Sequence, residues 1–176
     1  MCKSFLGSIV LLLGMGGFFL PNPAVSKASA EHRVPLKRAC VVEAAEAFGL
    51  PESALWVILG VERGQVGERT PNPNDTYDYG PFQINTIWLE ELSDYNISQK
   101  ELLYNGCVNA MVAAWILHHH WDSERPFRSI GNYHSQTPEV HWRYRLHIMD
   151  LLTGNRDTTI EELIEQANRE IEHHVR

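Results

Sequence analysis

Apolar residues recur with a helical period through much of the chain downstream of residue 37. From Arg38 to Phe48 they return every three or four positions, and Gly49 then marks a helix end. Pro51–Arg63 is mostly apolar from its fourth residue onward, which predicts a buried helix with the proline in its first turn. Cys107–Trp121 predicts a third buried helix, because its alanines are typical of close packing in a core.

Shorter patterns predict further elements of secondary structure. Ser98 and Glu101 have the spacing of a helix-capping box. Arg69–Asp78 is dense in Pro, Asn, Asp and Thr, which predicts a loop or a short hairpin. Other helices are predicted at Thr86–Leu92, Ser123–Ile130 and Pro138–Leu152. The expected fold is therefore α+β and predominantly α-helical, with one small β or loop element in a single domain.

The first thirty residues have the pattern of an export signal. Lys3 precedes an apolar run from Phe5 to Leu20, and Ala28-Ser29-Ala30 fits the small-x-small cleavage sequence. A retained membrane anchor is the alternative interpretation, but this run is short for a span of about 20 residues. We therefore predict cleavage after Ala30, a periplasmic mature protein and no stable membrane anchor.

Residues 154–176 differ in character from the preceding domain, which we place at residues 31–153. Thr159–Glu162 looks like a helix cap, and the apolar residues that follow lie on one face of a charged amphipathic helix. This helix would pack on the domain, bind a partner or project as a tail. Packing on the domain is the interpretation that we favour.

Charge and cysteine content narrow the functional classes. The net charge is −7, which argues against a nucleic-acid partner because binding to phosphates needs a basic face. Two cysteines, Cys40 and Cys107, lie downstream of the predicted cleavage site. In an oxidising compartment such a pair is expected to form a disulfide, and two free buried thiols are the alternative.

The candidate catalytic residue is Glu62, near the end of an apolar helical stretch. Desolvation disfavours the charged form of a carboxyl group and raises its pKa. A carboxylic acid that is still protonated near neutral pH suits the general acid of a glycosidase. Taken alone, a surface glutamate near a helix end is the simpler interpretation.

A second candidate segment is Asp78–Asn85, with the sequence Asp-Tyr-Gly-Pro-Phe-Gln-Ile-Asn. If this segment is extended, Gln83 and Asn85 share one face. Amides on the wall of a cleft are suited to binding sugar hydroxyl and acetamido groups. A turn with capping amides explains the same residues equally well.

These blocks, followed by Asn132–Pro138 with its tyrosine, resemble the lysozyme-like lytic transglycosylases of the goose-type, or SLT-domain, class. The most similar subset is the small exported enzymes of type IV secretion, conjugation and pilus machines. The resemblance covers Arg38–Leu152, and Cys40 and Cys107 stand where that subset has its cysteine pair. It implies a single lysozyme-like domain that cleaves peptidoglycan.

The resemblance also implies a role for each matching residue. Glu62 would be the general acid and later the base, and Tyr133 would hydrogen-bond near its carboxyl group and orient it. The amides of Gln83 and Asn85 would line the sugar-binding cleft. Further candidate substrate contacts are Tyr79, Phe82 and His134.

Three residues depart from the family pattern. Arg63 stands in place of serine, and a cation beside Glu62 would lower the pKa of its carboxyl group if it faced it. Pro81-Phe82 replaces Leu-Met, and His134 replaces asparagine. Phe82 retains an apolar wall, so this change is expected to be mild.

Neither a metal nor a cofactor is expected. Three consecutive histidines, His118–His120, point about 100° apart on a helix and so do not converge on one ion. His134 lies beside Tyr133. A contact in the cleft and a structural role in a turn explain this residue equally well.

The expected function is peptidoglycan cleavage between N-acetylmuramic acid and N-acetylglucosamine with formation of a 1,6-anhydro ring. The expected partners are glycan strands and a component of the secretion, conjugation or pilus apparatus, and the machine is implied by the resemblance alone. A hydrolytic muramidase is the nearest alternative and would require a second carboxylate, for which Asp75 and Asp78 are candidates. A non-catalytic wall-binding module is the third possible function, and the presence of Arg63 beside Glu62 is its best support.

Overall fold

The computed structural model describes residues 32–154 and 158–173 of the chain. Both stretches belong to one compact unit, Glu31–Arg176. The predicted signal peptide and its cleavage site lie outside the described residues, so both stay predictions. Within the described ranges, no helix is long and apolar enough to cross a membrane.

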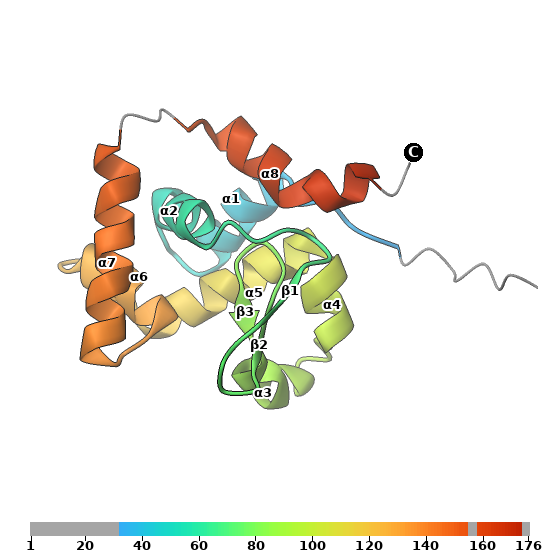
Figure 1. Cartoon of the computed structure of the whole chain (residues 1–176), viewed down its shortest axis with the longest axis horizontal. Helices are drawn as coiled ribbons and strands as arrows, with labels where there is room; N and C mark the ends of the chain where they lie inside the picture. Colours follow the sequence, from blue (N-terminus) through green and yellow to red (C-terminus); the bar gives the residue numbers. More distant parts are fainter. Residues whose placement is uncertain (1–31, 155–157, 174–176) are drawn as a thin grey trace, which may run out of the picture. The chain divides into compact units, whose positions relative to one another are not determined.

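The described residues form a set of helices and one small antiparallel sheet (Figure 1). The α-helices are α1 (Arg38–Ala47), α2 (Glu52–Glu62), α3 (Leu89–Ser93), α4 (Gln99–Tyr104), α5 (Gly106–His119), α6 (Pro126–His134), α7 (Pro138–Thr153) and α8 (Ile160–His173), and a 3₁₀ turn, η1 (Thr86–Trp88), precedes α3. The strands β1 (Arg69–Pro71), β2 (Tyr77–Tyr79) and β3 (Ile84–Asn85) pair in that order. The predicted α+β, predominantly α-helical fold class is confirmed.

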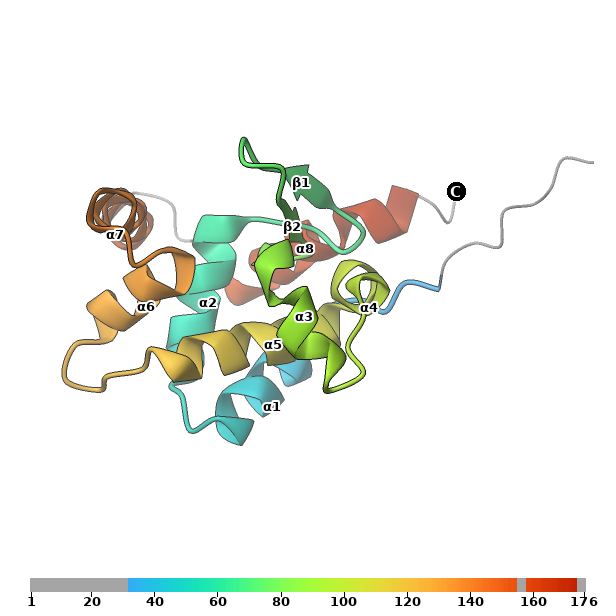
Figure 2. The ribbon, with the colours of Figure 1, turned by 90° about the horizontal axis from the view of Figure 1, so that it is seen from below.

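Helix α2 is the central element of the fold. It packs against α1, α5, α6, α7 and α8. Leu55 and Ile58 on this helix are completely buried. Figure 2 shows α5 between α1 on one side and the sheet on the other. Because α2 is held from several sides, the residue at its C-terminal end has a well-defined position.

Local sequence signals account for several of the helix ends. The capping box at Ser98 is formed, since Glu101 N donates to Ser98 Oγ and Ser98 N donates to Glu101 Oε2. Helix α6 begins at Pro126, three residues later than predicted, and it continues to His134. The reason is a turn that Asp122 stabilises, in which its carboxylate accepts hydrogen bonds from Glu124 N and the Arg125 side chain.

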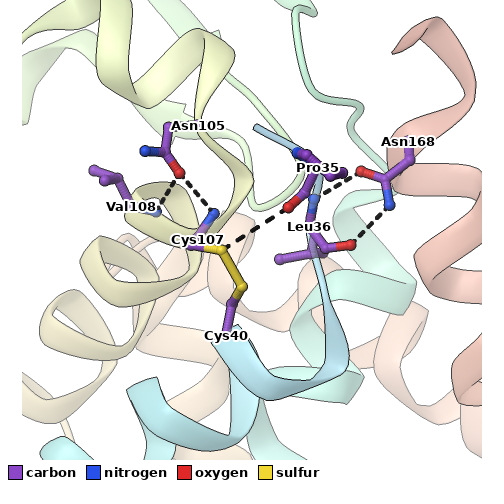
Figure 3. Close-up of a disulfide and its surroundings, with 7 residues drawn as sticks. All are labelled: Pro35, Leu36, Cys40, Asn105, Cys107, Val108 and Asn168. Atoms are coloured by element: carbon purple, nitrogen blue, oxygen red, sulfur yellow. Dashed lines mark hydrogen bonds between the residues drawn. A yellow bond between two sulfur atoms is a disulfide. The ribbon is translucent and has the colours of Figure 1, made fainter. Parts of the chain in front are cut away.

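A disulfide between Cys40 and Cys107 joins α1 to the first turn of α5 (Figure 3). The two Cα atoms lie 4.9 Å apart, and the cysteines are separated by 67 positions in the sequence. Asn105 caps α5 beside the bond, because its Oδ1 accepts from Cys107 N and Val108 N. The predicted disulfide is confirmed, and the alternative of two free thiols is excluded.

The C-terminal helix α8 packs on α2 and on the chain segments around Leu36 and Val66. Asn168 donates from its amide to Leu36 O and accepts from Leu36 N, with both distances 2.7 Å (Figure 3). Ala167 is completely buried, and its carbonyl accepts a bond from Val66 N. The cap predicted at the start of this helix is formed by Thr159 and Glu162, which bond each other's backbone N–H groups.

Candidate active site

Glu62 is the last residue of α2. The helix ends because Arg63 adopts a left-handed conformation, with φ 53°, while its N–H still donates to Leu59 O. The Glu62 side chain is 11% exposed. The carboxyl group therefore lies at the end of a rigid buried helix and retains limited access to solvent.

This carboxyl group opens into a cleft of about 770 Å³. The walls of the cleft come from the β1–β2 loop, strands β2 and β3, the end of α5, and the segment from the end of α6 into α7. The lining residues are Glu62, Asn72, Pro73, Asn74, Thr76, Asp78, Gln83, Ile84, Asn85, Ile87, Trp88, Ile116, His120, Asn132, Tyr133, His134, Ser135, Gln136 and Val140.

The cleft brings together most of the residues singled out from the sequence. Glu62, Gln83, Asn85, Tyr133 and His134 all line it. The first and last of them, Glu62 and His134, are 72 positions apart in the sequence. The fold therefore assembles one polar cavity from the three sequence blocks.

Phe82 and Tyr79 do not line the cleft. Their side chains are 0% and 2% exposed and belong to the hydrophobic core. Their backbone N–H and C=O groups make the hydrogen bonds that hold the Gly80–Gln83 turn, and their side chains do not reach the cleft. A direct contact between either ring and a sugar, as expected from the sequence, is not available in this structure.

The segment between β2 and β3 is a turn, not the extended stretch that would place Gln83 and Asn85 on one face. Gly80 has φ 69° and Gln83 has φ 49°, and Gln83 N donates to Gly80 O. The Gln83 side chain also donates to Gly80 O, at 2.9 Å. A Cβ atom on Gly64 would collide with Gly80 O and the Gln83 amide. Gly64 is therefore needed for the chain after Glu62 to pass close to this turn.

Asn85 has the capping role that the sequence left open. Its Nδ2 donates to Asp78 Oδ1 at 2.7 Å and to Thr76 Oγ1 at 3.1 Å. Its Oδ1 accepts from Ile87 N at the start of η1. The amide thus fixes the hairpin and the following turn while its residue lines the cleft.

Asn109 is a structural residue of the site that the sequence patterns did not single out. It is completely buried on α5, accepts from Phe82 N and donates to the carbonyls of Tyr79 and Leu102. A polar residue inside the apolar stretch Cys107–Trp121 was the available signal, since a buried amide needs hydrogen-bond partners. Asn109 therefore fixes the Gly80–Gln83 turn to α5.

Tyr133, on α6, makes a further hydrogen bond to the same turn. Its hydroxyl donates to Phe82 O at 2.8 Å, not to Glu62 as the resemblance implied. Burial raises the pKa of Tyr133 well above 10, and the charges of Glu62 and Asp78 raise it further. The phenol therefore stays neutral and retains its proton for this bond.

His134 contacts the candidate acid directly. Its Nδ1 lies 3.5 Å from Glu62 Oε1, and its ring stacks on that of Tyr144 with a centroid separation of 4.5 Å. The hydrogen bond to Glu62 raises the pKa of His134, burial opposes this, and the charges of Glu62 and Asp78 add to the increase. His134 and Glu62 are therefore electrostatically coupled.

Tyr144, on α7, is the other buried group beside Glu62. It is 4% exposed, and its hydroxyl lies near the Glu62 carboxyl group without a hydrogen bond of ordinary geometry. Burial raises its pKa well above 10, and the Glu62 carboxylate and Tyr133 contribute. Neither Tyr144 nor Trp142, whose side chain is 56% exposed, lines the cleft.

Only one of the two candidate second carboxylates is in the cleft. Asp78 lines it and accepts from Asn85. Asp75 is exposed in the β1–β2 loop with φ 62° and does not line the cleft. Arg63, whose charge was the main departure from the family pattern, lines a different hollow beside α7 and α8.

The cleft also contains residues with no role assigned from the sequence. Trp88 lines it while its ring packs edge-on against Trp115. His120 lines it as well, and burial lowers the pKa of its imidazole. The adjacent His118 and His119 bond different carbonyls, those of Phe48 and Trp115. In the described part of the chain, no group of His, Cys, Asp and Glu is arranged to hold a metal ion.

Comparison with known proteins gives a partial match. The chain matches no family model. Over 82 residues it is 30% identical to the Invasion protein IagB of Salmonella typhimurium and to that of Salmonella typhi. The similarity covers 44% of this chain and 49% of each relative, so the chain spans about half the length of the curated relatives that it matches. The chain is thus distantly similar in sequence to these invasion proteins.

Proposed function

We propose that this protein is a peptidoglycan lytic transglycosylase with Glu62 as its general acid and base. The observation that carries the proposal is the position of Glu62, nearly buried at the end of α2 and open to a polar cleft of about 770 Å³. The three sequence blocks that resemble lytic transglycosylases supply cleft residues, which supports the same function. The similarity to the invasion proteins is compatible with an exported protein that acts at the cell envelope.

The reaction has two steps at the same carboxyl group. Glu62 first protonates the glycosidic oxygen between N-acetylmuramic acid and N-acetylglucosamine while the acetamido group of the substrate stabilises the cationic centre. The Glu62 carboxylate then takes the proton of the 6-hydroxyl, whose oxygen closes the 1,6-anhydro ring. Acid–base catalysis of this kind contributes about 10²- to 10⁴-fold in rate.

The surrounding residues supply orientation. Gln83, in the turn that Asn109 and Tyr133 hold in place, and Asn85, in β3, both line the cleft. Holding a substrate in a reactive geometry removes much of the entropic barrier to reaction. Trp88 offers an aromatic surface in the same cleft on which a sugar ring is able to pack.

A hydrolytic muramidase is the second candidate, and the position of Asp78 favours it. This carboxylate lines the same cleft as Glu62 and interacts with Tyr133 and His134, which both surround Glu62. A second carboxylate is what a hydrolase needs to form a glycosyl-enzyme or to activate water. The non-catalytic alternative lacks comparable support, because the Arg63 side chain on which it rested does not line the cleft.

We further propose that the protein acts after export, on glycan strands next to a secretion, conjugation or pilus apparatus, and that a component of that apparatus is its partner. The predicted signal peptide supports export. The Cys40–Cys107 disulfide supports an oxidising compartment, where such bonds persist.

The role of Glu62 is tested by release of soluble fragments from dye-labelled peptidoglycan. The protein without its first thirty residues is compared with Glu62→Gln and with the matched control Glu52→Gln, at an exposed position in the first turn of the same helix. Glu62→Gln is expected to lower the rate at least 100-fold while Glu52→Gln has no effect. Equal rates for Glu62→Gln and the unmodified protein would exclude Glu62 as the acid.

A further inference from the structure

Helix α7 carries apolar residues on two opposite faces. It packs on α2 and α6, and its buried residues are Tyr144 and Ile148. On the other face, four large apolar side chains are each 48–56% exposed, and we call them the outer stripe: Trp142, Leu146, Met149 and Leu152. A helix that is apolar on both faces is normally buried on both, so the outer stripe lacks a partner that its composition favours.

The outer stripe is one continuous surface and lies apart from the cleft. Its residues stand at positions i, i+4, i+7 and i+10, so they follow one side of the helix for nearly three turns. Single exposed apolar residues are ordinary, whereas a contiguous exposed patch is typical of an interaction site. None of the four residues lines the cleft, and in Figures 1 and 2 α7 lies at one end of the unit, away from the sheet. Binding of substrate beside Glu62 therefore does not account for them.

The outer stripe is nearly the same when the helix direction is reversed. Trp142 and Leu152 each lie five positions from residue 147, on opposite sides of it. Leu146 and Met149 lie one and two positions from the same point. If two copies of α7 pack antiparallel about a two-fold axis near residue 147, Trp142 faces Leu152 of the second copy. Leu146 then faces Met149 of the second copy, and an interface between identical subunits needs such self-complementarity.

The charges beside the outer stripe follow the same symmetry. Arg143 and Asp150 are exposed on one flank of the stripe, four positions before and three positions after residue 147. In the antiparallel arrangement each Arg143 faces Asp150 of the other copy. Arg143 contacts Glu139 in its own helix at 3.3 Å, but an exposed pair of this kind is weak and leaves the guanidinium available. The Asp150 carboxylate makes no ion pair with another residue that the structure describes.

We propose that the outer stripe of α7 is the interface of a homodimer in which two copies of the helix pack antiparallel. Residues of both signs flank the stripe, which suits a second copy better than an anionic membrane surface, since that surface attracts a basic helix face. One helix face is small for a permanent interface, so the dimer is expected to be weak and to depend on concentration. The inference does not rest on the proposed function of Glu62.

Sedimentation velocity of residues 31–176, which form the compact unit, tests the dimer at concentrations from about 1 to 300 µM. The mass of the wild type is expected to rise from one chain to two. Leu146→Glu is expected to raise the dissociation constant at least about 10-fold, because it buries an unpaired carboxylate in the interface. The matched control is Tyr95→Glu, at a position 62% exposed outside α7, which is expected to dimerise like the wild type. A wild type that stays at the mass of one chain, or a Leu146→Glu variant that dimerises equally well, would overturn the proposal.

A charge exchange tests the antiparallel arrangement. Arg143→Glu and Asp150→Arg are each expected to weaken the dimer, because each places like charges opposite one another. The double variant is expected to restore the wild-type dissociation constant, since the facing charges are again of opposite sign. Circular dichroism checks that each variant is folded. A folded double variant that dimerises no better than the single variants would overturn the proposed pairing of Arg143 with Asp150.

Discussion

The residue that differs most from its expected role is His134. From the sequence it is a candidate substrate contact or a turn residue, but in the structure its Nδ1 faces the Glu62 carboxylate. The pKa of His134 is raised chiefly by its hydrogen bond to Glu62 and also by the charges of Glu62 and Asp78. The negative charge beside the imidazole thus favours the protonated form of His134 in the folded protein.

This coupling predicts a pH-dependent contribution to stability. Because the folded-state pKa of His134 is raised, its contribution is complete below the unfolded-state value of about 6.5 and disappears as the pH rises through the folded-state value. Solvent screening keeps the effect small, since the side chain is 42% exposed. Denaturant unfolding of wild type and His134→Gln is expected to show a larger stability difference at pH 6 than at pH 8.5. Equal differences at both pH values would contradict the coupling.

The sequence predicted the catalytic candidates better than their contacts. Glu62, Gln83 and Asn85 were recognisable because each stands in a motif with a characteristic spacing. The burial of Tyr79 and Phe82, and the bond from Tyr133 to Phe82 O, depend on how β2 packs against α4 and β3 against α5. Asn109 acts through contacts with residues that are distant in the sequence, so its place in an apolar stretch indicates a buried amide but not the turn that it holds.

At the scale of elements, helix periodicity was the most reliable signal. The bounds of α1, α2, α5 and α7 lie within two residues of those predicted. The bounds of α6 depend on the turn at Asp122 and the proline after it, and the apolar pattern does not show them. For Asp78–Asn85 the sequence left an extended segment and a turn equally well supported, because the conformation of the Gly80–Gln83 turn depends on hydrogen bonds from the distant Asn109 as well as on local ones.

The disulfide between α1 and α5 predicts a measurable loss of stability on removal. Its 67-residue separation corresponds to about 4 kcal/mol of unfolding free energy in the chain-entropy model. Denaturant unfolding of Cys40→Ala/Cys107→Ala is expected to show a decrease of this order. Reduction of the wild type with dithiothreitol serves as a control and should give a similar decrease. A change of less than about 1 kcal/mol would mean that the bond constrains the unfolded chain little.

At the scale of the whole unit, α2 is the helix on which most of the other long helices pack. Helices α1, α5, α6, α7 and α8 all pack on α2, whose last residue is Glu62. The amphipathic pattern of α8 predicted a buried face, but its partners followed only from the structure. Asn168 binds both backbone polar groups of Leu36, four residues before Cys40 in the sequence. The two ends of the described chain are thereby joined to the same core.

Mass spectrometry of the products released from purified peptidoglycan tests the central claim most directly. We expect muropeptides that end in 1,6-anhydro-N-acetylmuramic acid, formed by the wild type and by Asp78→Asn but not by Glu62→Gln. Products with reducing ends, lost in Asp78→Asn as well as in Glu62→Gln, would contradict the lytic reaction and establish hydrolysis. Anhydro products from Glu62→Gln at the wild-type rate would contradict the role of Glu62 as the general acid and base.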